Sequence, residues 1–358
     1  MKEDNIIGKV KPVDPNSKPN DKNMVFGADY TVTSTTDSNG KVLTNVEVIL
    51  CFWGSFWNTT PAPSPSSDDY KKAIQGILSG PYLGRLSQYR GVGNATLIYT
   101  DMNHSTDPVN GYSDADVVTM LKSRLQNTSM PAPSATHNRF YAVIFPPGIK
   151  NALAGDAGQH QSFVYNGHRG YYAWMWNTGS LTGHNCVTKV FSHELVEALT
   201  DPDVDNGLGY GILVNGTKPG GGTVSNDEIG DTCNNEYATV DMNGINCSVQ
   251  SYWSKVDNAC VLPVNPPKNG SLNIVAIRKL YSDDLGVDFI SEVKAIDATG
   301  NNYIMYRAEV IQYIQTNGNT FYVHGADGSK AKVIVDTHYI KTVADNSLED
   351  NLLSLPNF

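Results

Sequence analysis

Charged side chains are scarce in this sequence, and basic ones are the scarcer kind. Only 17% of its 358 residues are charged, against roughly 25% in an average soluble domain. The formal net charge is −10 and no basic stripe is present, which argues against nucleic acid and anionic membranes as partners. No apolar run reaches the roughly 18 residues of a membrane span. The longest candidate, residues 46–53, predicts a buried strand.

Several signatures of other functional classes are also missing. The five cysteines contain no C-x-x-C pair, which excludes a zinc ribbon and a thioredoxin-like motif. There is no G-x-S-x-G elbow, P-loop or dinucleotide fingerprint. The chain begins with a polar stretch rich in Pro, Asn and Lys, so we expect no signal peptide in the chain as given. The low charge and the many Gly, Asn, Ser, Thr and Tyr residues nevertheless favour an extracellular protein, with a cytoplasmic one as the alternative.

Composition and periodicity predict three parts. Residues 1–42 offer little that could build a core, so we expect them to be disordered or extended, with order beginning near Val42. Residues 43–263 carry strands and amphipathic helices that can form one large domain. After a linker rich in Pro and Asn, residues 271–358 predict a small α+β accessory domain. The expected fold class of the whole chain is therefore α+β.

The most informative motif is S-H-E-L-V-E-A-L-T-D-P at residues 192–202. The apolar spacing predicts a helix, on which His193 and Glu197 lie one turn apart on the same face. H-E-x-x-H helices bind zinc at this spacing, and here Glu takes the place of the second His. Glu194 then occupies the position of the general base, which accepts a proton from a zinc-bound water.

A zinc site needs a third protein ligand. An acidic cluster, N-D-E-I-G-D-T-C, follows at residues 226–233, and either Glu228 or Asp231 could supply that ligand. An isolated H-E-x-x-E is more often an ordinary exposed pair than a metal site. The otherwise apolar helix and the acidic cluster favour zinc held by His193, Glu197 and one of the two acids.

Three weaker candidates lie near this motif. Residues 201–207 place oxygen ligands at alternate positions, as a calcium loop does, but the Gly and final Glu of an EF-hand are missing, so calcium is the second choice of cation. His168 could stabilise an oxyanion or bind the metal, although a hydrogen-bonded loop histidine is the more common case. Tyr172, Trp174 and Trp176 share one face of a predicted strand; core packing is expected, but an exposed face would suit a glycan.

The combined pattern resembles a known family. H-E-L-V-E-A-L-T-D-P followed by E-I-G-D-T-C is similar to the phosphate-induced, EXORDIUM-like proteins of plants and their bacterial relatives, as is the aromatic turn at residues 52–57. The resemblance covers about residues 43–262 and implies a secreted protein with a zincin-like mixed sheet and an active-site helix. The tail, about residues 272–356, resembles a small bacterial domain family of unknown function and implies no chemistry.

These patterns predict a zinc-dependent metallohydrolase, specifically a peptidase acting on peptides or proteins. The alternative is a non-catalytic secreted protein on a zincin-like fold that binds a glycan or another protein, with or without a metal that stabilises the fold. Cys233 and Cys260 lie at the two ends of the same loop-rich segment, so we expect them to form a disulfide if the protein matures in an oxidising compartment.

Overall fold

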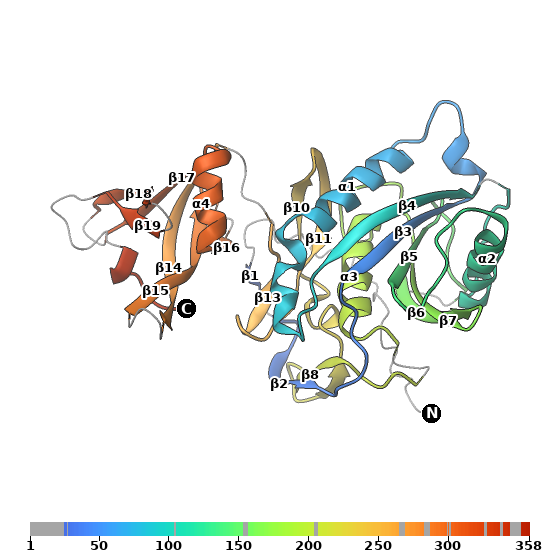
Figure 1. Cartoon of the computed structure of the whole chain (residues 1–358), viewed down its shortest axis with the longest axis horizontal. Helices are drawn as coiled ribbons and strands as arrows, with labels where there is room; N and C mark the ends of the chain where they lie inside the picture. The colour runs from blue at the N-terminus through green and yellow to red at the C-terminus, as the bar shows by residue number, and fades with distance from the viewer. Residues whose placement is uncertain are drawn as a thin grey trace. The chain divides into compact units, whose positions relative to one another are not determined.

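The computed structural model describes residues 25–26, 28–103, 105–152, 157–203, 207–264, 269–282, 287–298, 300, 302–325, 328–336, 339–343 and 352–358. The chain divides into two compact units: the described residues of one lie within residues 26–262, and those of the other are Val25 and residues within 263–358. Helices and mixed sheets occur together in the chain (Figure 1), which confirms the expected α+β class.

A five-stranded sheet of order β4-β3-β5-β7-β6 organises the larger unit. Its strands are β3 (Val46–Trp53), β4 (Ala95–Asn103), β5 (Asn138–Ile144), β6 (Gly158–Tyr165) and β7 (His168–Met175). Strands β3, β4, β5 and β7 run parallel to one another, whereas β6 at one edge is antiparallel to β7. The central strands β3 and β5 are almost wholly buried, as expected for a parallel sheet with helices on both faces.

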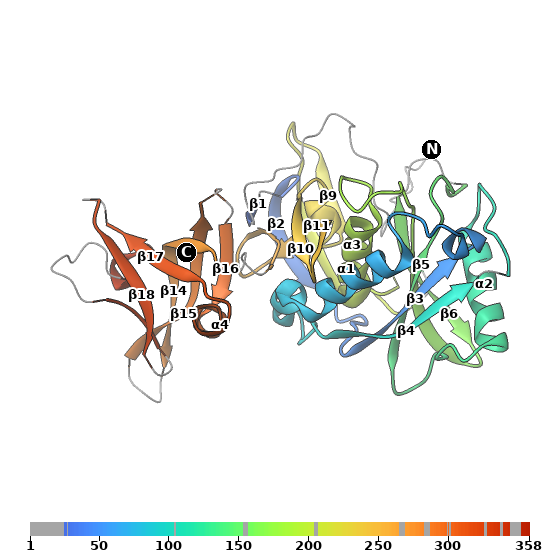
Figure 2. The same ribbon diagram turned by 90° about the horizontal axis from the view of Figure 1, so that it is seen from above.

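Three helices cover this sheet (Figures 1 and 2). They are α1 (Ser67–Ser79), α2 (Asp114–Asn127) and α3 (Val187–Thr200), and capping boxes begin α1 and α2. Alternate residues of a strand point to opposite faces. Cys51 of β3 accordingly packs in one core with Leu121 of α2, whereas Phe140 of β5 contacts Phe191 of α3 on the other face. The sheet therefore separates α2 from α3.

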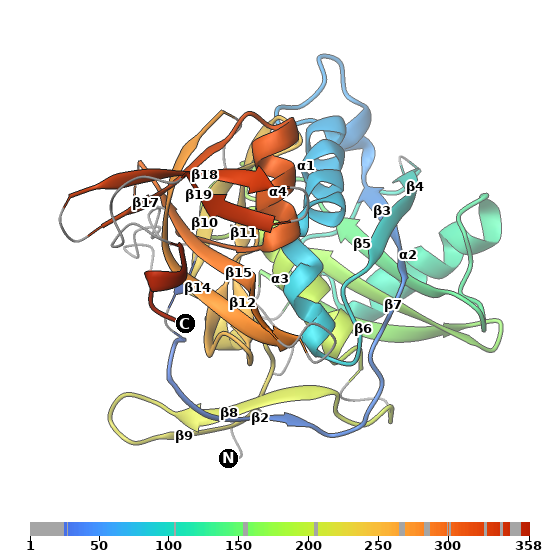
Figure 3. The same cartoon turned by 60° about the vertical axis from the view of Figure 1, so that its left-hand side comes forward.

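Shorter segments complete the larger unit around α3. A three-stranded sheet has the order β2-β8-β9, which Figure 3 shows side by side; β10 and β11 form a hairpin, and β1, β13 and β12 form a further small sheet. The bounds are β1 (Val25–Phe26), β2 (Thr31–Asp37), β8 (Ile212–Thr217), β9 (Thr223–Asp227), β10 (Tyr237–Met242), β11 (Ile245–Gln250), β12 (Tyr252–Ser254) and β13 (Ala259–Val261). Three 3-10 helices are η1 (Ser55–Asn58), η2 (Pro81–Gln88) and η3 (Asp231–Cys233).

The expectation that order begins near Val42 is wrong, because β2 lies upstream of it and pairs with β8. Tyr30 is buried and its hydroxyl is 2.9 Å from Oγ1 of Thr232. The indole N–H of Trp253 donates to Oγ1 of Thr35 at 2.9 Å. A polar strand is thus held by a distant partner, which its own composition does not reveal. Residues 1–24 and residue 27 of the predicted N-terminal segment lie outside the described residues.

The expected disulfide is present, between Cys233 and Cys260. It joins η3 to β13 and closes a loop that contains the β10–β11 hairpin. The segments that follow α3 are therefore tied together covalently as well as by strand pairing.

The smaller unit is a six-stranded sheet of order β16-β15-β14-β17-β18-β19. Its elements are β14 (Ser271–Ser282), β15 (Val287–Asp297), β16 (Asn302–Tyr306), α4 (Arg307–Thr316), β17 (Thr320–His324), β18 (Lys330–Asp336), β19 (Tyr339–Thr342) and η4 (Leu352–Ser354). In the described part of the chain, no helix has both the length and the apolar character needed to cross a membrane.

Candidate functional site

Helix α3 is buried along its whole length, charged residues included. It follows Cys186 and ends just before Pro202, because proline cannot donate a helical hydrogen bond and disfavours helical geometry in the residue before it. His193, Glu194 and Glu197 are each 0% exposed. Buried charge is costly unless it is compensated, so neighbouring segments must supply partners for these three side chains.

The first group of partners joins His193, Glu197 and Asp231. Nε2 of His193 lies 3.1 Å from Oε1 of Glu197 and 3.8 Å from Oδ1 of Asp231. The backbone N–H of Asp231 donates to Oε1 of Glu197 at 3.0 Å. Gly230 permits this approach, since a Cβ there would lie 2.7 Å from the same oxygen. Of the two downstream acids left open by the sequence, the fold brings Asp231 to His193.

The other ring nitrogen of His193 faces Gln250, the last residue of β11. The Gln250 side-chain N–H₂ group donates to Nδ1 of His193 at 2.7 Å and to the carbonyl oxygen of Gly230 at 2.9 Å. Gln250 is 0% exposed. This amide therefore fixes the orientation of the His193 imidazole through the ring nitrogen that does not face Glu197 and Asp231.

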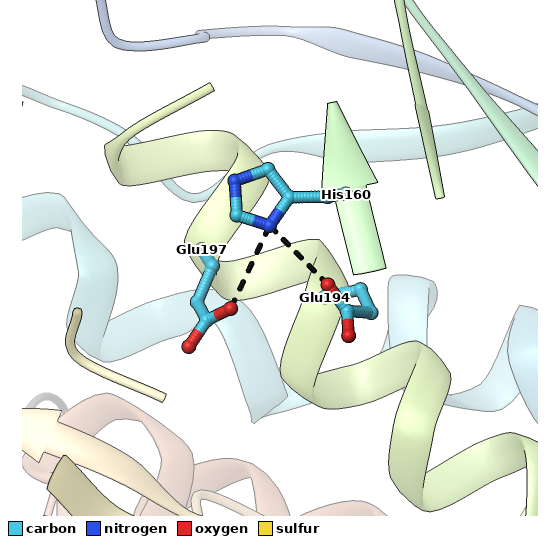
Figure 4. Close-up of side chains that lie close together, drawn as sticks. All are labelled: His160, Glu194 and Glu197. Atoms are coloured by element: carbon cyan, nitrogen blue, oxygen red, sulfur yellow. Dashed lines mark hydrogen bonds and ion pairs between the residues drawn. The ribbon is translucent and has the colours of Figure 1, made fainter. Parts of the chain in front are cut away.

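The second group joins His160, Glu194 and Glu197, and Figure 4 shows both carboxylates directed toward the same ring nitrogen. Nδ1 of His160 lies 3.2 Å from Oε2 of Glu194 and 3.6 Å from Oε2 of Glu197. Nε2 of His160 lies 3.0 Å from the carbonyl oxygen of Asp201. Because a carbonyl only accepts hydrogen bonds, Nε2 carries the hydrogen and donates it.

Glu197 belongs to both groups and gives each a different oxygen. Its Oε1 faces His193, and its Oε2 faces His160 and accepts no hydrogen bond from any described residue. Glu228 lies on the far side of the second imidazole, with Oε1 3.5 Å from Nε2 of His160. Neither of its oxygens accepts a hydrogen bond from a described residue, although the side chain is 0% exposed.

Burial and charge shift the pKa values of these groups in opposite directions. Burial by itself would raise the pKa of Glu197, but the neighbouring His193 and His160 outweigh it and hold that pKa at about 2. Burial, with Glu197 close by, raises the pKa of Glu228 well above its usual range. Burial would lower the pKa of His160, yet the surrounding Glu228 and Glu194 raise it well above the ordinary histidine value.

Both groups are buried clusters that could hold a metal ion. At metal–ligand distances of about 2.0–2.2 Å and tetrahedral angles, neighbouring ligand atoms lie about 3.3–3.6 Å apart. Imidazole-to-carboxylate distances of 3.1 and 3.8 Å in the first group, and of 3.2 and 3.6 Å in the second, bracket that range. The donor set, imidazole nitrogen with carboxylate oxygen, is one that zinc accepts.

His168, a catalytic candidate from the sequence, is not part of either group. It begins β7, pairs with Tyr165 across the β6–β7 hairpin, and is exposed. The histidine that reaches α3 is His160, on the neighbouring strand β6. The sequence shows His160 only as one of several histidines before the motif, because nothing local reveals which strand lies beside α3.

In the described part of the weaker candidate, the calcium-like loop after α3, the carboxylates of Asp201 and Asp203 form hydrogen bonds with the protein. Oδ1 of Asp201 accepts the backbone N–H of Gly211 at 3.0 Å, and Oδ2 of Asp203 accepts from Arg169 and from the hydroxyl of Ser162. Residues 204–206 lie outside the described residues. These bonds engage one oxygen of each acid, whereas Oδ2 of Asp201 is buried and accepts no hydrogen bond from a described residue.

The predicted aromatic face is largely core. Tyr172 is 2% and Trp174 0% exposed, and the indole N–H of Trp174 donates to Oδ1 of Asp114 at 2.7 Å. These two rings are therefore inaccessible to a glycan.

Lys189 is a buried cation that the sequence reasoning missed. It lies one turn before His193 on α3, and its Nζ donates to the carbonyl oxygen of Asn234 at 3.0 Å. Nζ also lies 5.7 Å from the centre of the Tyr237 ring. Burial lowers the pKa of Lys189 to about 7. The sequence does carry a signal for Lys189. A helix that is otherwise apolar is expected to be buried, and a lysine within it is then expected to be buried as well.

Comparison with known proteins informs only the smaller unit. A family model described as a protein of unknown function (DUF3892) matches residues 273–356. No curated protein and no solved structure matches the chain. The larger unit must therefore be interpreted from its own geometry.

Proposed function

We propose that this protein is a metal-dependent hydrolase, with zinc as its ion and a peptide bond as its target. The observation that carries the proposal is the buried His193–Glu197–Asp231 group, with Glu194 on the same turn of α3. Two of the three ligands come from one helical turn, and the third comes from a segment tied down by the disulfide at Cys233. That construction provides three protein ligands, the number found in catalytic zinc sites.

His193, Glu197 and Asp231 would hold the ion. When bound, a divalent ion acts there as a Lewis acid, which lowers the pKa of a water and polarises a carbonyl oxygen. Glu194 accepts the proton of the attacking water and returns it to the leaving amine, the role of a general acid–base group. His160 is a positioning residue, because its Nδ1 lies 3.2 Å from Oε2 of Glu194 and holds that carboxylate against β6.

The surrounding architecture supports this interpretation. A mixed five-stranded sheet with the motif helix packed against it is the arrangement that the resemblance to zincin-like proteins implies. Gly158 at the start of β6 allows the edge strand to approach α3, since a Cβ there would lie 2.7 Å from Oε1 of Glu194. The close packing keeps Glu194 against β6 and beside His160. A secreted, extracellular protein remains part of the proposal, on the same resemblance.

The burial of the site favours a second candidate function. His193 and Glu197 are 0% exposed and Asp231 6%, and an ion so enclosed would suit a structural site, which has no open position for substrate. The chain would then be a non-catalytic binding protein for a peptide or glycan, stabilised by its metal. Both candidates require the ion, and only the hydrolase requires Glu194 as a base.

Metal analysis and activity together test the proposal. The full chain, purified without chelators, should contain zinc, and His193→Ala should lose it, whereas His168→Ala should not. A quenched fluorescent peptide library provides the activity measurement. Bound zinc together with peptide hydrolysis supports the hydrolase, and bound zinc without hydrolysis supports the structural alternative. Unchanged metal content in His193→Ala would contradict both.

A further inference from the structure

The second group, His160 with Glu194 and Glu197, has the features of an additional ion site. One ligand atom from each residue lies within 4.8 Å of the others. Oε2 of Glu197, buried and without a hydrogen-bond donor among the described residues, is directed into the group toward Nδ1 of His160 (Figure 4). Such an oxygen is costly to leave unpaired, and a cation between the two side chains would satisfy it.

The imidazole of His160 is already arranged for metal binding. Metal-bound histidines usually donate their other ring N–H to a carboxylate or a backbone carbonyl, which fixes the tautomer. Nε2 of His160 donates to the carbonyl of Asp201 at 3.0 Å. Nδ1 lies within hydrogen-bond distance of Oε2 of Glu194, at 3.2 Å, and is therefore the ring nitrogen that can exchange its proton for a metal ion held by Glu194 and Glu197.

The buried carboxylates around the two imidazoles favour positive charge at this place. Four carboxylates lie against the imidazoles, and none is more than 6% exposed: Glu194, Glu197, Glu228 and Asp231. Buried negative charge is expensive when it is not compensated, and a divalent ion between His160, Glu194 and Glu197 would compensate two of these carboxylates directly.

We infer that His160, Glu194 and Glu197 form a second divalent-cation site, and that its occupation inhibits hydrolysis. Glu197 would bridge the two ions, giving Oε1 to the first and Oε2 to the second. The second ion takes the carboxylate of Glu194 as a ligand, so that this group no longer accepts a proton. The inhibition rests on the proposed function, whereas the binding does not.

The second ion should bind more weakly than the first. The two cations share one carboxylate, and like charges at close range in a buried site repel each other. Low concentrations of zinc should therefore fill the His193 group, and higher concentrations the His160 group. Activity should rise and then fall as zinc is added.

Zinc titration of the full chain, stripped of metal by a chelator, tests the binding. Calorimetry with elemental analysis should find two ions per chain in distinct steps, and only one in His160→Ala. His168→Ala, which removes an exposed histidine of the next strand, should keep both. Because His160→Ala empties a buried position, Glu194→Gln serves as a second variant that preserves shape; it should keep the first ion and lose the second.

Each outcome separates the two ideas. One ion per wild-type chain, lost in His193→Ala, overturns the second site and leaves the proposed function standing. No bound ion overturns both. Two ions in Glu194→Gln and in a folded His160→Ala would show that the second ion lies elsewhere. If two ions bind but hydrolytic activity keeps rising while the second ion binds, the inferred inhibition is wrong and the second site itself stands.

Discussion

The side-chain amide of Gln250 lies 2.7 Å from Nδ1 of His193. An amide can turn to offer either its N–H₂ group or its oxygen. It can therefore donate to Nδ1 in the present arrangement, and accept from Nδ1–H when Nε2 holds a metal ion. A residue 57 positions away in the sequence thus supports the proposed ligand in both states.

Gln250→Leu should weaken binding of the first zinc ion by about 10–100-fold, because loss of a group that orients a metal-bound histidine typically costs that much. Competition with a chromogenic chelator measures this affinity. Gln88→Leu is the matched control, since Gln88 also makes side-chain hydrogen bonds, to Ser254 and Val256, away from the site. Equal affinity in Gln250→Leu and wild type would show that the amide has no influence on the ligand.

Glu194→Gln should leave the first zinc ion in place and reduce hydrolysis by a factor on the order of 10² to 10⁴, the usual effect of losing a general base. The substitution keeps the size of the side chain and much of its hydrogen bonding. Metal content and steady-state rates on the most sensitive library peptide give the two readouts. Loss of the first ion would instead make Glu194 one of its ligands, and an undiminished rate would remove its role as a base.

Lys189 should make the protein more stable as the pH rises from 7 to 10. Its pKa is about 7 in the folded chain, whereas an unburied lysine has a pKa of 10.5. Between these values the unfolded chain binds the proton and the folded chain does not, so this residue adds up to about 1.4 kcal/mol of stability per pH unit. The free energy of unfolding in urea, measured across this range, should therefore rise more steeply in wild type than in Lys189→Met.

Lys72→Met is the control for this comparison, because Lys72 is exposed on α1. It should keep the wild-type slope. A slope in Lys189→Met that equals the wild-type slope would mean that the buried amine remains protonated throughout, with a pKa near its ordinary value.

Tyr30→Ala should destabilise the larger unit by about 3–5 kcal/mol, the cost of truncating a buried aromatic side chain. Tyr30→Phe removes the hydroxyl that is hydrogen-bonded to Thr232 and should cost about 1 kcal/mol. Both values come from urea unfolding. If Tyr30→Ala unfolds like wild type, the region just before β2 contributes nothing to the fold, as its polar composition first suggested.

Reduction of the disulfide should lower stability by about 3–4 kcal/mol, because the bond between Cys233 and Cys260 closes a loop with a sequence separation of 27. Thermal unfolding of wild type with and without reductant measures the effect. The double variant Cys233→Ser, Cys260→Ser should unfold like the reduced protein and ignore the reductant. A wild-type transition unmoved by reductant would indicate that the two thiols are unlinked in solution.

Much of the site was predictable from residues close together in the chain. The spacing of His193 and Glu197 places them on one face because every α-helix repeats each 3.6 residues, and α3 forms where the motif predicts it. The α+β class followed in the same way, since strand and helix periodicities are local. The pairing of Cys233 with Cys260 could be anticipated because both border one loop-rich segment.

The tertiary structure alone decided which distant residues meet α3. It placed Asp231 at His193 and Glu228 at His160, brought His160 to the helix and left His168 exposed. These contacts depend on the order of strands in the sheet and on the paths of loops between elements far apart in the sequence. No local spacing encodes such distances, because they arise only when the elements pack together and bury their shared charges.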